Sequence, residues 1–246
     1  MQKAKVPEFT IVIPAWNEEE AIGEAIAKVE AYFKGRHFEL LIVDDGSSDK
    51  TALIVKGLMK KYSNLKLVQH AKNLGMGAAI STGFSRARGA VVINMDADLT
   101  HPLSKVDEML RNIERGYDVV ICSRYVSGGG MRGIPAWRQA ITIVCNWIFR
   151  LIFWSGIRDM TSGFRAYRKE AAERISLKSR GFEAPLESSV KIIRMRLKFK
   201  EIPLVLGVRR RGSSKFNYKK AFKTYVPAVI KLFLYRWFGV EYGGVM

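Results

Sequence analysis

Short apolar runs and amphipathic stretches alternate along the first 122 residues of the chain. The apolar runs are rich in Val, Ile, Leu and Phe, which predicts β-strands at 9–14, 38–43, 65–69, 90–95 and 118–122. Between them, apolar residues recur three or four positions apart, which predicts helices at 18–33, 75–88 and 102–115, and one that begins at Ser48 or Asp49. Such alternation is typical of an α/β fold with a mostly parallel sheet flanked by helices.

Two later apolar stretches, 141–154 and 224–238, are shorter than the roughly 20 residues that cross a membrane and are interrupted by polar or charged residues. Both mix Trp, Phe and Tyr with Lys and Arg, a combination that favours the boundary between lipid headgroups and acyl chains. Each stretch is therefore predicted to be an interfacial amphipathic helix, and the alternative is a helix buried against the domain. The polar start of the chain leads straight into a strand, so we expect no signal peptide.

Charge is distributed unevenly along the chain. Residues 1–120 hold 16 basic and 16 acidic side chains, residues 121–189 have a net charge of +6, and residues 190–246 have a net charge of +12. A cationic C-terminal half indicates an anionic partner, which is nucleic acid, a lipid surface or a phosphorylated substrate. The sequence has neither a basic reading helix nor RNP-type aromatic residues, so we expect no nucleic-acid partner.

Polar clusters follow three of the predicted strands, namely Trp16-Asn17-Glu18, Asp44-Asp45-Gly46-Ser47 and Asp96-Ala97-Asp98. Ligands of parallel sheets bind beyond the carboxyl ends of the strands, so the three clusters are predicted to share one site. Asp96 and Asp98 repel each other unless a cation lies between them. Carboxylate oxygens suit Mg²⁺ or Mn²⁺, so we predict a divalent metal at these two residues.

The remaining residues at this edge have competing interpretations. Asp45 either accepts a hydrogen bond from a nucleobase or ribose, or serves with Asp44 and Asp49 in turn and helix-cap chemistry. Gly75 and Gly77 open a helix, and their bare backbone is predicted to let a diphosphate or ribose approach closely. Further along, the glycine run at 128–130 predicts a mobile loop.

The segments IVIPAWNEEEAI, LIVDDGSSDKT, NLGMGAAISTGF and INMDADLTHP resemble the successive motifs of glycosyltransferase family two. The later segments CSRYVSGG, TSGFRAYR and RRRGSSKF resemble the branch that contains dolichyl-phosphate mannose synthases. The resemblance implies a GT-A fold, a nucleoside-diphosphate sugar donor and inversion at the anomeric carbon. We expect a GT-A domain at 1–218, with a nucleotide-binding half at 1–122 and an acceptor-binding half at 123–218, followed by an amphipathic, membrane-proximal helix at 219–246.

Carried over position by position, the resemblance implies roles for individual residues. The nucleoside pocket would be lined by Pro14, Trp16 and Glu18, with Asp45 on the base, and the diphosphate and metal would be held by Asp96, Ala97 and Asp98. Phosphate groups would be contacted by Arg124, Arg138, Arg209 and Lys215. Trp16 stands where the family often has Tyr. Thr100 stands where the synthase branch often has Gln, so a contact of Thr100 with metal or phosphate is left open.

The identity of the acceptor decides whether the enzyme needs a base. A phosphate monoester is largely ionised at pH 7 and needs none, whereas a sugar hydroxyl needs a positioned carboxylate. The QxxRW motif of processive polysaccharide synthases is absent, because Tyr235-Arg236-Trp237 lacks the glutamine in register. Asp159 is the best candidate among the carboxylates that have no other predicted role. It is predicted to contact the donor sugar or act as a base, and the alternative is that it holds the loop of the acceptor segment.

A polyprenyl phosphate has an anionic head and a long apolar tail. Arg138 stands one turn before a predicted apolar helix face, so consecutive turns would meet the head and the tail. That face consists of Ile141, Val144, Ile148, Leu151 and Ile152.

We therefore predict transfer of mannose from GDP-mannose to a polyprenyl (dolichyl) phosphate by an enzyme attached peripherally to the cytoplasmic face of a membrane. The predicted catalytic residues are Asp98, Arg124, Arg138 and Asp159. The alternatives are a UDP-glucose-dependent polyprenyl-phosphate glucosyltransferase and transfer to a glycan hydroxyl. A membrane-spanning partner subunit is left open, because relatives in the family often carry extra spans.

Overall fold

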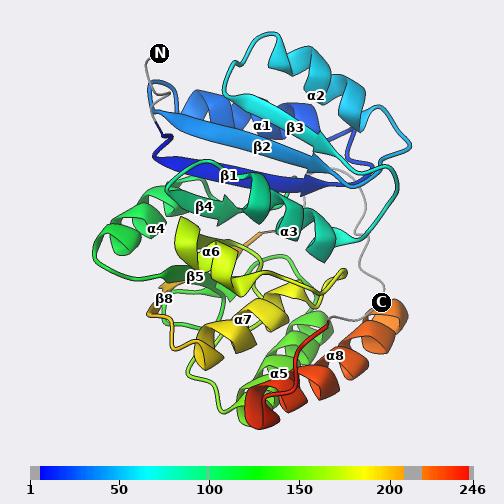
Figure 1. Ribbon diagram of the computed structural model, residues 1–246, viewed down its shortest axis with the longest axis vertical. Helices are drawn as coiled ribbons and strands as arrows, with labels where there is room; N and C mark the ends of the chain where they lie inside the picture. Colours follow the sequence, from blue (N-terminus) through cyan, green and yellow to red (C-terminus); the bar gives the residue numbers. More distant parts are fainter. Residues whose placement is uncertain (1–5, 99, 208–217, 244–246) are drawn as a thin grey trace.

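A seven-stranded sheet in the order β3-β2-β1-β4-β7-β5-β8 runs through the centre of the protein (Figure 1). The computed structural model describes residues 6–98, 100–207 and 218–243. Within this sheet β7 is antiparallel to its neighbours β4 and β5, and the remaining pairs are parallel. The strands are β1 (Phe9–Ala15), β2 (Phe38–Asp44), β3 (Leu65–Gln69), β4 (Val91–Asn94), β5 (Val119–Ser123), β7 (Arg165–Arg168) and β8 (Phe199–Pro203). The five predicted strands are confirmed, each to within one residue at either end.

Helices connect the strands and cover both faces of the sheet (Figure 1). They are α1 (Ile22–Tyr32), α2 (Thr51–Met59), α3 (Met76–Arg86), α4 (Ser104–Glu114), α5 (Ala136–Phe153), α6 (Lys169–Ile175), α7 (Ala184–Arg194) and α8 (Tyr218–Phe238). The first helix begins four residues later than its periodicity predicts. Asn17 has a left-handed backbone with a φ of 51°, and the Glu18 carbonyl accepts from the amides of Ala21 and Ile22, so these residues form a turn before the helix.

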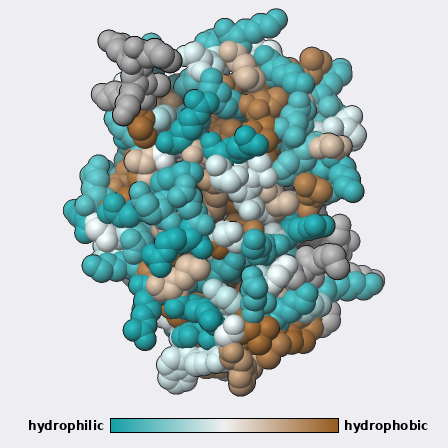
Figure 2. Space-filling model, in the orientation of Figure 1, coloured by the Kyte–Doolittle hydropathy of each residue, from teal (hydrophilic) through white to brown (hydrophobic). Residues whose placement is uncertain are grey.

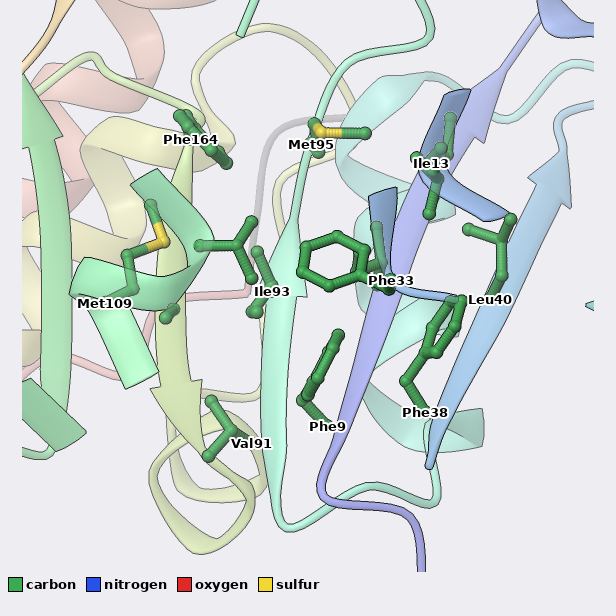
Figure 3. Packing of buried hydrophobic residues seen from close by; sticks show 14 of the residues in the cluster. Phe9, Ile13, Phe33, Phe38, Leu40, Val91, Ile93, Met95, Met109 and Phe164 are labelled. Carbon is green, nitrogen blue, oxygen red and sulfur yellow. The ribbon is translucent and has the colours of Figure 1, made fainter. Parts of the chain in front are cut away.

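The sheet has an apolar core on each face, because successive side chains of a strand point to opposite sides. On β1, Ile11 and Ile13 join the core beneath α1, α2 and α4, whereas Val12 joins the core beneath α3, α6 and α7. This double burial explains why the strands read as unbroken apolar runs. In the first core the ring of Phe33 packs on those of Phe9 and Phe38, with centroids 5.2 and 5.6 Å away (Figure 3). Burial of each such ring stabilises the fold by about 1.5–3 kcal/mol.

A short second sheet corrects the prediction of a mobile glycine loop. β6 (Gly130–Met131) pairs in parallel with β9 (Val205–Leu206). A Cβ on Gly129 would lie 2.6 Å from the carbonyl oxygen of Ser123, so glycine at this one position permits a close approach of two backbone segments.

The C-terminal helix lies against α5 and adds to the second core (Figure 1). Ala228 and Leu232 of α8 are fully buried, and the rings of Tyr225 and Phe149 stack with centroids 6.0 Å apart. The other sides of both helices are exposed. No helix in the described ranges has the length and hydropathy needed to cross a bilayer. The domain boundaries at 122 and 218 stay predictions.

Candidate active site

The three polar clusters lie at the carboxyl ends of adjacent strands. Ala15 of β1 pairs with Asp44 of β2, and Val12 of β1 pairs with Asn94 of β4. Because neighbouring strands are about 4.8 Å apart, the residues that follow these pairs share one edge of the sheet. The clusters at 16–18, 44–47 and 96–98 therefore border one region, as the strand pattern predicts.

Asp96 and Asp98 leave the sheet just past β4, and Ala97 between them is buried. The side chain of Asp96 is 44% exposed. An oxygen of Asp98 accepts from the Thr100 hydroxyl at 2.7 Å and from the Thr100 amide at 3.1 Å. Thr100 thus orients Asp98, and its hydroxyl hydrogen is used within the chain.

His101 is a site residue that the sequence analysis missed. Its ring stacks on Phe164 with centroids 4.4 Å apart, and its Nδ1 accepts from the Asp96 amide at 3.4 Å. The Nε2 atom lies 3.8 Å from an Asp96 carboxylate oxygen. A histidine three residues after the DxD, directly before a proline, is the sequence signal that marks this position.

The donor set at Asp96 and Asp98 fits Mg²⁺ or Mn²⁺. Both side chains offer hard oxygen ligands at a partly exposed strand end. In the described part of the chain, no group of three or more His, Cys, Asp or Glu side chains is placed to hold a metal. One or two carboxylates completed by water and substrate phosphate oxygens are the usual protein environment of Mg²⁺, so two carboxylates suffice.

Asp44 and Asp45 are both buried and bonded within the chain. Asp44 accepts from the Ser47 amide at 3.2 Å and from the Gln69 side chain at 3.1 Å. Asp45 accepts from the amides of Leu74 and Gly75 at 2.9 and 2.7 Å. These bonds match the turn-and-cap interpretation of the two acids, and a direct contact of Asp45 with a nucleobase stays a prediction.

His70, a second residue that was missed, completes the surroundings of Asp45. It follows β3 at the same edge of the sheet, and its Nδ1 lies 2.7 Å from an Asp45 oxygen. Its Nε2 lies 2.9 Å from the Thr82 hydroxyl of α3. The ring therefore joins the end of β2 to α3.

The glycines at 75 and 77 face protein backbone. A Cβ on Gly75 would lie 2.2 Å from the carbonyl oxygen of Arg180, and one on Gly77 would lie 2.2 Å from that of Ser179. The Gly77 amide donates to Arg180 at 2.7 Å. The predicted reason for these glycines, an open approach for diphosphate, is therefore corrected: they admit the segment before α7.

The residues predicted to line the nucleoside pocket lie at the end of β1. Trp16 is 41% exposed, and Pro14 and Glu18 are half-buried. The Glu18 amide donates to the Thr51 hydroxyl at 2.8 Å, which ties this turn to the start of α2. The indole of Trp16 is thus partly open to solvent at this end of the strand.

Arg124 and Asp159, predicted separately, form one buried ion pair. The guanidinium donates from Nε and Nη2 to the two carboxylate oxygens at 2.8 and 2.7 Å, and the Arg124 amide donates to the same group at 3.0 Å. Burial alone would raise the pKa of Asp159, but the charge and hydrogen bonds of Arg124 hold that pKa below its ordinary value. The Nη2 atom also donates to Thr161 at 2.9 Å.

This pairing disagrees with a role of Asp159 as a base. Its side chain is fully buried, and a carboxylate with a lowered pKa and a bidentate partner is a weak proton acceptor. The geometry matches the other interpretation, in which Asp159 holds the acceptor-side loop. The Asp159 amide is itself held by Glu201 at 2.9 Å.

Arg165 is a third residue whose role the sequence did not reveal. It is fully buried, and it donates to the carbonyls of Asp159, Met160 and Ser162 and to the Ser189 hydroxyl. The buried guanidinium thus fixes the loop that carries Asp159.

Arg138 lies on the first turn of α5, where it is exposed and its guanidinium carbon lies 5.1 Å from the ring centroid of Trp137. The predicted apolar face of α5 is largely exposed: Ile141, Val144, Ile148 and Leu151 are each between 40% and 53% accessible. Figure 2 shows hydrophobic surface at this end of the molecule, in the region of α5 and α8. Arg209 and Lys215 lie outside the described residues.

Comparison with known proteins places these features in a family. The sequence pattern of Glycosyl transferase family 2 matches residues 10–176. The chain is 34% identical over 216 residues to a dolichol-phosphate mannosyltransferase of Pyrococcus furiosus, covering 87% of this chain and 60% of that protein. It is 31% identical over 214 residues to a polyprenol monophosphomannose synthase of Mycolicibacterium smegmatis, covering 84% of this chain and 80% of that protein. The chain thus spans less than two thirds of the first relative.

Solved structures share the fold. Glucosyl-3-phosphoglycerate synthase of Mycobacterium tuberculosis, in complex with Mn²⁺, UDP-glucose and phosphoglyceric acid, superposes with a TM-score of 0.68. The two sequences are 18% identical, and the match covers 94% of this chain and 79% of that one. The architecture is that of the GT-A glycosyltransferases.

Proposed function

This chain belongs to glycosyl transferase family 2, and we propose that it transfers mannose from GDP-mannose to a polyprenyl phosphate at the cytoplasmic face of a membrane. The names of the two relatives support mannose as the sugar and a polyprenyl phosphate as the acceptor. The Mn²⁺ and UDP-glucose of the solved structure support a metal and a nucleotide-sugar donor for the fold.

The donor end of the site is the edge formed by β2, β1 and β4. We propose that the nucleoside lies against Trp16, Pro14 and Glu18, and that Asp45 contacts the base or shapes the pocket through the glycine turn. Asp96 and Asp98 would hold Mg²⁺ or Mn²⁺, which, when bound, stabilises negative charge on the diphosphate leaving group. Their partial exposure supports access by a phosphate-bearing ligand.

Cationic side chains are proposed to offset the negative charge of the substrate phosphates. Arg124 is held rigidly by Asp159, so its guanidinium is oriented before substrate binds. We propose that Arg124 and Arg138 contact phosphate groups of the substrates, together with Arg209 and Lys215.

The observation that carries the acceptor proposal is the exposed apolar face of α5, which begins one turn after Arg138. A polyprenyl phosphate matches this order, because arginine binds a phosphate head bidentately and the apolar face contacts the tail. The buried Asp159 agrees with an acceptor that needs no base. The phosphate oxygen attacks the anomeric carbon as the bond to the nucleoside diphosphate breaks, which inverts the configuration.

We further propose that the protein binds the membrane peripherally through α5 and α8. Their exposed aromatic residues and nearby Arg and Lys support a headgroup-level position. A membrane-spanning partner subunit is compatible with this surface.

A panel of labelled donors and acceptors tests the proposed reaction. The purified enzyme with Mn²⁺ should transfer mannose from GDP-mannose to a polyprenyl phosphate and give no product with the neutral polyprenol. Transfer of glucose from UDP-glucose would support the glucosyltransferase alternative. A free polyprenol or sugar that is glycosylated at a comparable rate would overturn the lipid-phosphate acceptor.

Arg138→Ala tests the acceptor end alone. We expect it to abolish transfer to polyprenyl phosphate and to leave the Kd for GDP-mannose unchanged, because Arg138 is proposed to contact the acceptor. Arg111→Ala, an exposed arginine of α4, is the matched control and should leave both properties unchanged. Equal loss of donor affinity in Arg138→Ala would contradict this assignment.

A further inference from the structure

The segment 176–183, between α6 and α7, joins the C-terminal helix to the donor side of the molecule. We call it the bridging segment. It begins at Ser176, whose backbone is left-handed with a φ of 39°, and it ends at Glu183 before α7. Two tyrosine side chains from α8 and the residues after it contact this segment, and the start of α3 packs against it as well.

The bridging segment is in close contact with the start of α3 and the glycine turn before it. The Gly77 amide donates to the Arg180 carbonyl at 2.7 Å, and the Ser81 hydroxyl donates to the Leu177 carbonyl at 3.0 Å. The backbone atoms at 179–180 approach the two glycines of the turn so closely that a methyl group there would overlap them. A shift of the bridging segment toward α3 would therefore press on the turn at 73–77, and a shift away would break the Gly77–Arg180 hydrogen bond.

On the C-terminal side, two phenol groups hold the same segment. Tyr225 of α8 donates to the Phe182 carbonyl at 2.6 Å. The chain turns back after α8 at Gly239, which has a φ of 77°, and buries Tyr242 with its hydroxyl 2.6 Å from that of Ser179. The ring of Tyr242 also packs on Tyr235 of α8, with centroids 6.4 Å apart.

Two buried charged residues of α7 hold the bridging segment. The Glu187 carboxylate is fully buried and accepts from the Ser179 amide at 2.7 Å. Lys191 pairs with Glu187 at 2.5 Å and donates to the Ser176 carbonyl at 2.9 Å. The ammonium group lies 5.7 Å from the ring centroid of Tyr242. Tyr242 thus packs against a part of the bridging segment that Glu187 and Lys191 also hold.

From the glycine turn, the contacts continue to the donor site. The amides of Leu74 and Gly75 donate to Asp45, which also contacts His70. A continuous series of short hydrogen bonds and close packing therefore runs from α8 to the carboxyl end of β2. The opposite side of α8 is exposed and apolar at Ile230, Phe233 and Trp237.

We infer that Tyr225 and Tyr242 are positioning residues, through which contact of α8 with an anionic membrane tightens the binding of the nucleotide donor. This inference rests on the proposed function. A membrane surface restrains α8, the two phenols restrain the bridging segment, and the segment holds the glycine turn in the conformation that leaves Asp45 and its neighbours ready for the donor. The two phenol hydrogen bonds are each between neutral groups, which sets the size of the effect at about 2- to 10-fold in affinity.

The test measures the Kd of GDP-mannose and of UDP-glucose, each with Mn²⁺, for the full chain with and without vesicles of phosphatidylglycerol and phosphatidylcholine. For the wild type, vesicles should lower the Kd of the preferred donor by about 2- to 10-fold. Tyr242→Phe and Tyr225→Phe should remove this dependence on vesicles while they bind the vesicles as the wild type does.

Two further variants separate positioning from general stability. Ser179→Ala removes the same bond as Tyr242→Phe, so the double variant should have the same Kd as either single one. Tyr32→Phe is the control. The Tyr32 hydroxyl, at the end of α1, donates to Asp107 of α4 at 3.0 Å, away from these contacts, so this variant should keep the dependence of its donor Kd on vesicles. Thermal unfolding of each variant confirms that the folded protein is compared.

The outcomes distinguish the inference from the function on which it rests. A donor Kd that responds to vesicles equally in the wild type and in both phenylalanine variants overturns the coupling alone. A donor Kd of the wild type that is unchanged by vesicles also overturns the coupling alone. If the wild type binds neither nucleotide sugar in any condition, the proposed function fails and the coupling fails with it.

Discussion

Single residues in this site take their roles from their partners. Arg124 and Asp159 both carry charges that a mechanism can use, yet each is mainly occupied by the other in a bidentate pair. Asp45 has the residue type of a nucleobase ligand and already accepts two backbone hydrogen bonds. Side chains that border a binding site therefore also build it, and their substitution is expected to affect stability as well as activity.

The ion pair predicts a specific dependence of stability on pH. The pKa of Asp159 is lowered in the folded protein, so the pair stabilises the fold above the unfolded-state pKa of about 3.9, and this contribution is lost as pH falls through the folded-state value. Asp159→Asn should lower the free energy of unfolding at pH 7 by about 3–5 kcal/mol, and the difference from the wild type should shrink below pH 4.

Urea unfolding at several pH values measures this effect. Asp107→Asn is the matched control, because Asp107 pairs with Arg36 at the surface and exposed pairs contribute about 0–1 kcal/mol. A difference between Asp159→Asn and wild type that stays constant from pH 7 to pH 3 would show that the charge of Asp159 contributes nothing.

Asp98 carries the prediction on the metal. Asp98→Ala removes one of two carboxylate ligands, so it should weaken Mn²⁺ binding in the presence of nucleotide by about tenfold or more, and abolish transfer. Calorimetric titration with Mn²⁺ measures binding independently of activity. Glu114→Ala, at the exposed end of α4, should bind Mn²⁺ as the wild type does. Full activity of Asp98→Ala in the presence of a chelator is incompatible with a metal at this residue.

At the scale of elements, helix starts and strand ends position the site, and close backbone contacts set their spacing. The turn before α3 depends on two glycines that face the segment before α7. The start of α2 is tied to the turn after β1 by hydrogen bonds from Glu18 and Glu19 to Thr51 and Asp49. The sheet edge proposed to bind the donor is therefore built from turns that contact one another closely.

Two alanine substitutions in helices separate packing from helix propensity. Gly77→Ala on α3 would place a methyl group 2.2 Å from the Ser179 carbonyl oxygen, and overpacking of this kind costs about 1–3 kcal/mol. Gly57→Ala on α2 meets nothing within 4 Å and should stabilise the protein by up to about 1 kcal/mol through helix propensity. Thermal unfolding of the pair is the measurement, and a stabilised Gly77→Ala would contradict the close approach.

At the scale of the whole molecule, exposed apolar side chains gather at the end that carries α5 and α8 (Figure 2). The N-terminal half of the sequence is neutral, whereas the last 57 residues have a net charge of +12. Donor chemistry is proposed for one part of the molecule and membrane contact for another. The bridging segment lies between the two.

Vesicle flotation tests the membrane contact. The protein should float with vesicles that contain phosphatidylglycerol at low salt and dissociate as salt rises, because screening weakens the attraction of Lys and Arg to the surface. Leu151→Ser on α5 should reduce binding, whereas Leu53→Ser on α2 should not, although these leucines are 52% and 68% exposed. Absence of flotation at low salt, or equal loss in both variants, would refute the proposed surface.

The sequence by itself determined the alternation of strands and helices, the edge of the sheet where the polar clusters meet, and the DxD pair. These features depend on periodicities of two and 3.6 residues and on turns that are local in the chain, so a linear pattern is enough to predict them. It also separated the neutral half of the chain from the cationic half. The resemblance of its motifs added the family, which the comparisons confirm.

Only the tertiary structure decided which of these residues contact one another. Arg124 meets Asp159 across 35 residues, Tyr242 meets Ser179 across 63, and the Gly77 amide donates to the Arg180 carbonyl from another part of the fold. The structure also decided that one side of α5 stays exposed, where the sequence allowed an interfacial or a buried helix. Such contacts follow from how the helices pack on the sheet, and a short pattern holds no information about a partner that distant in the chain.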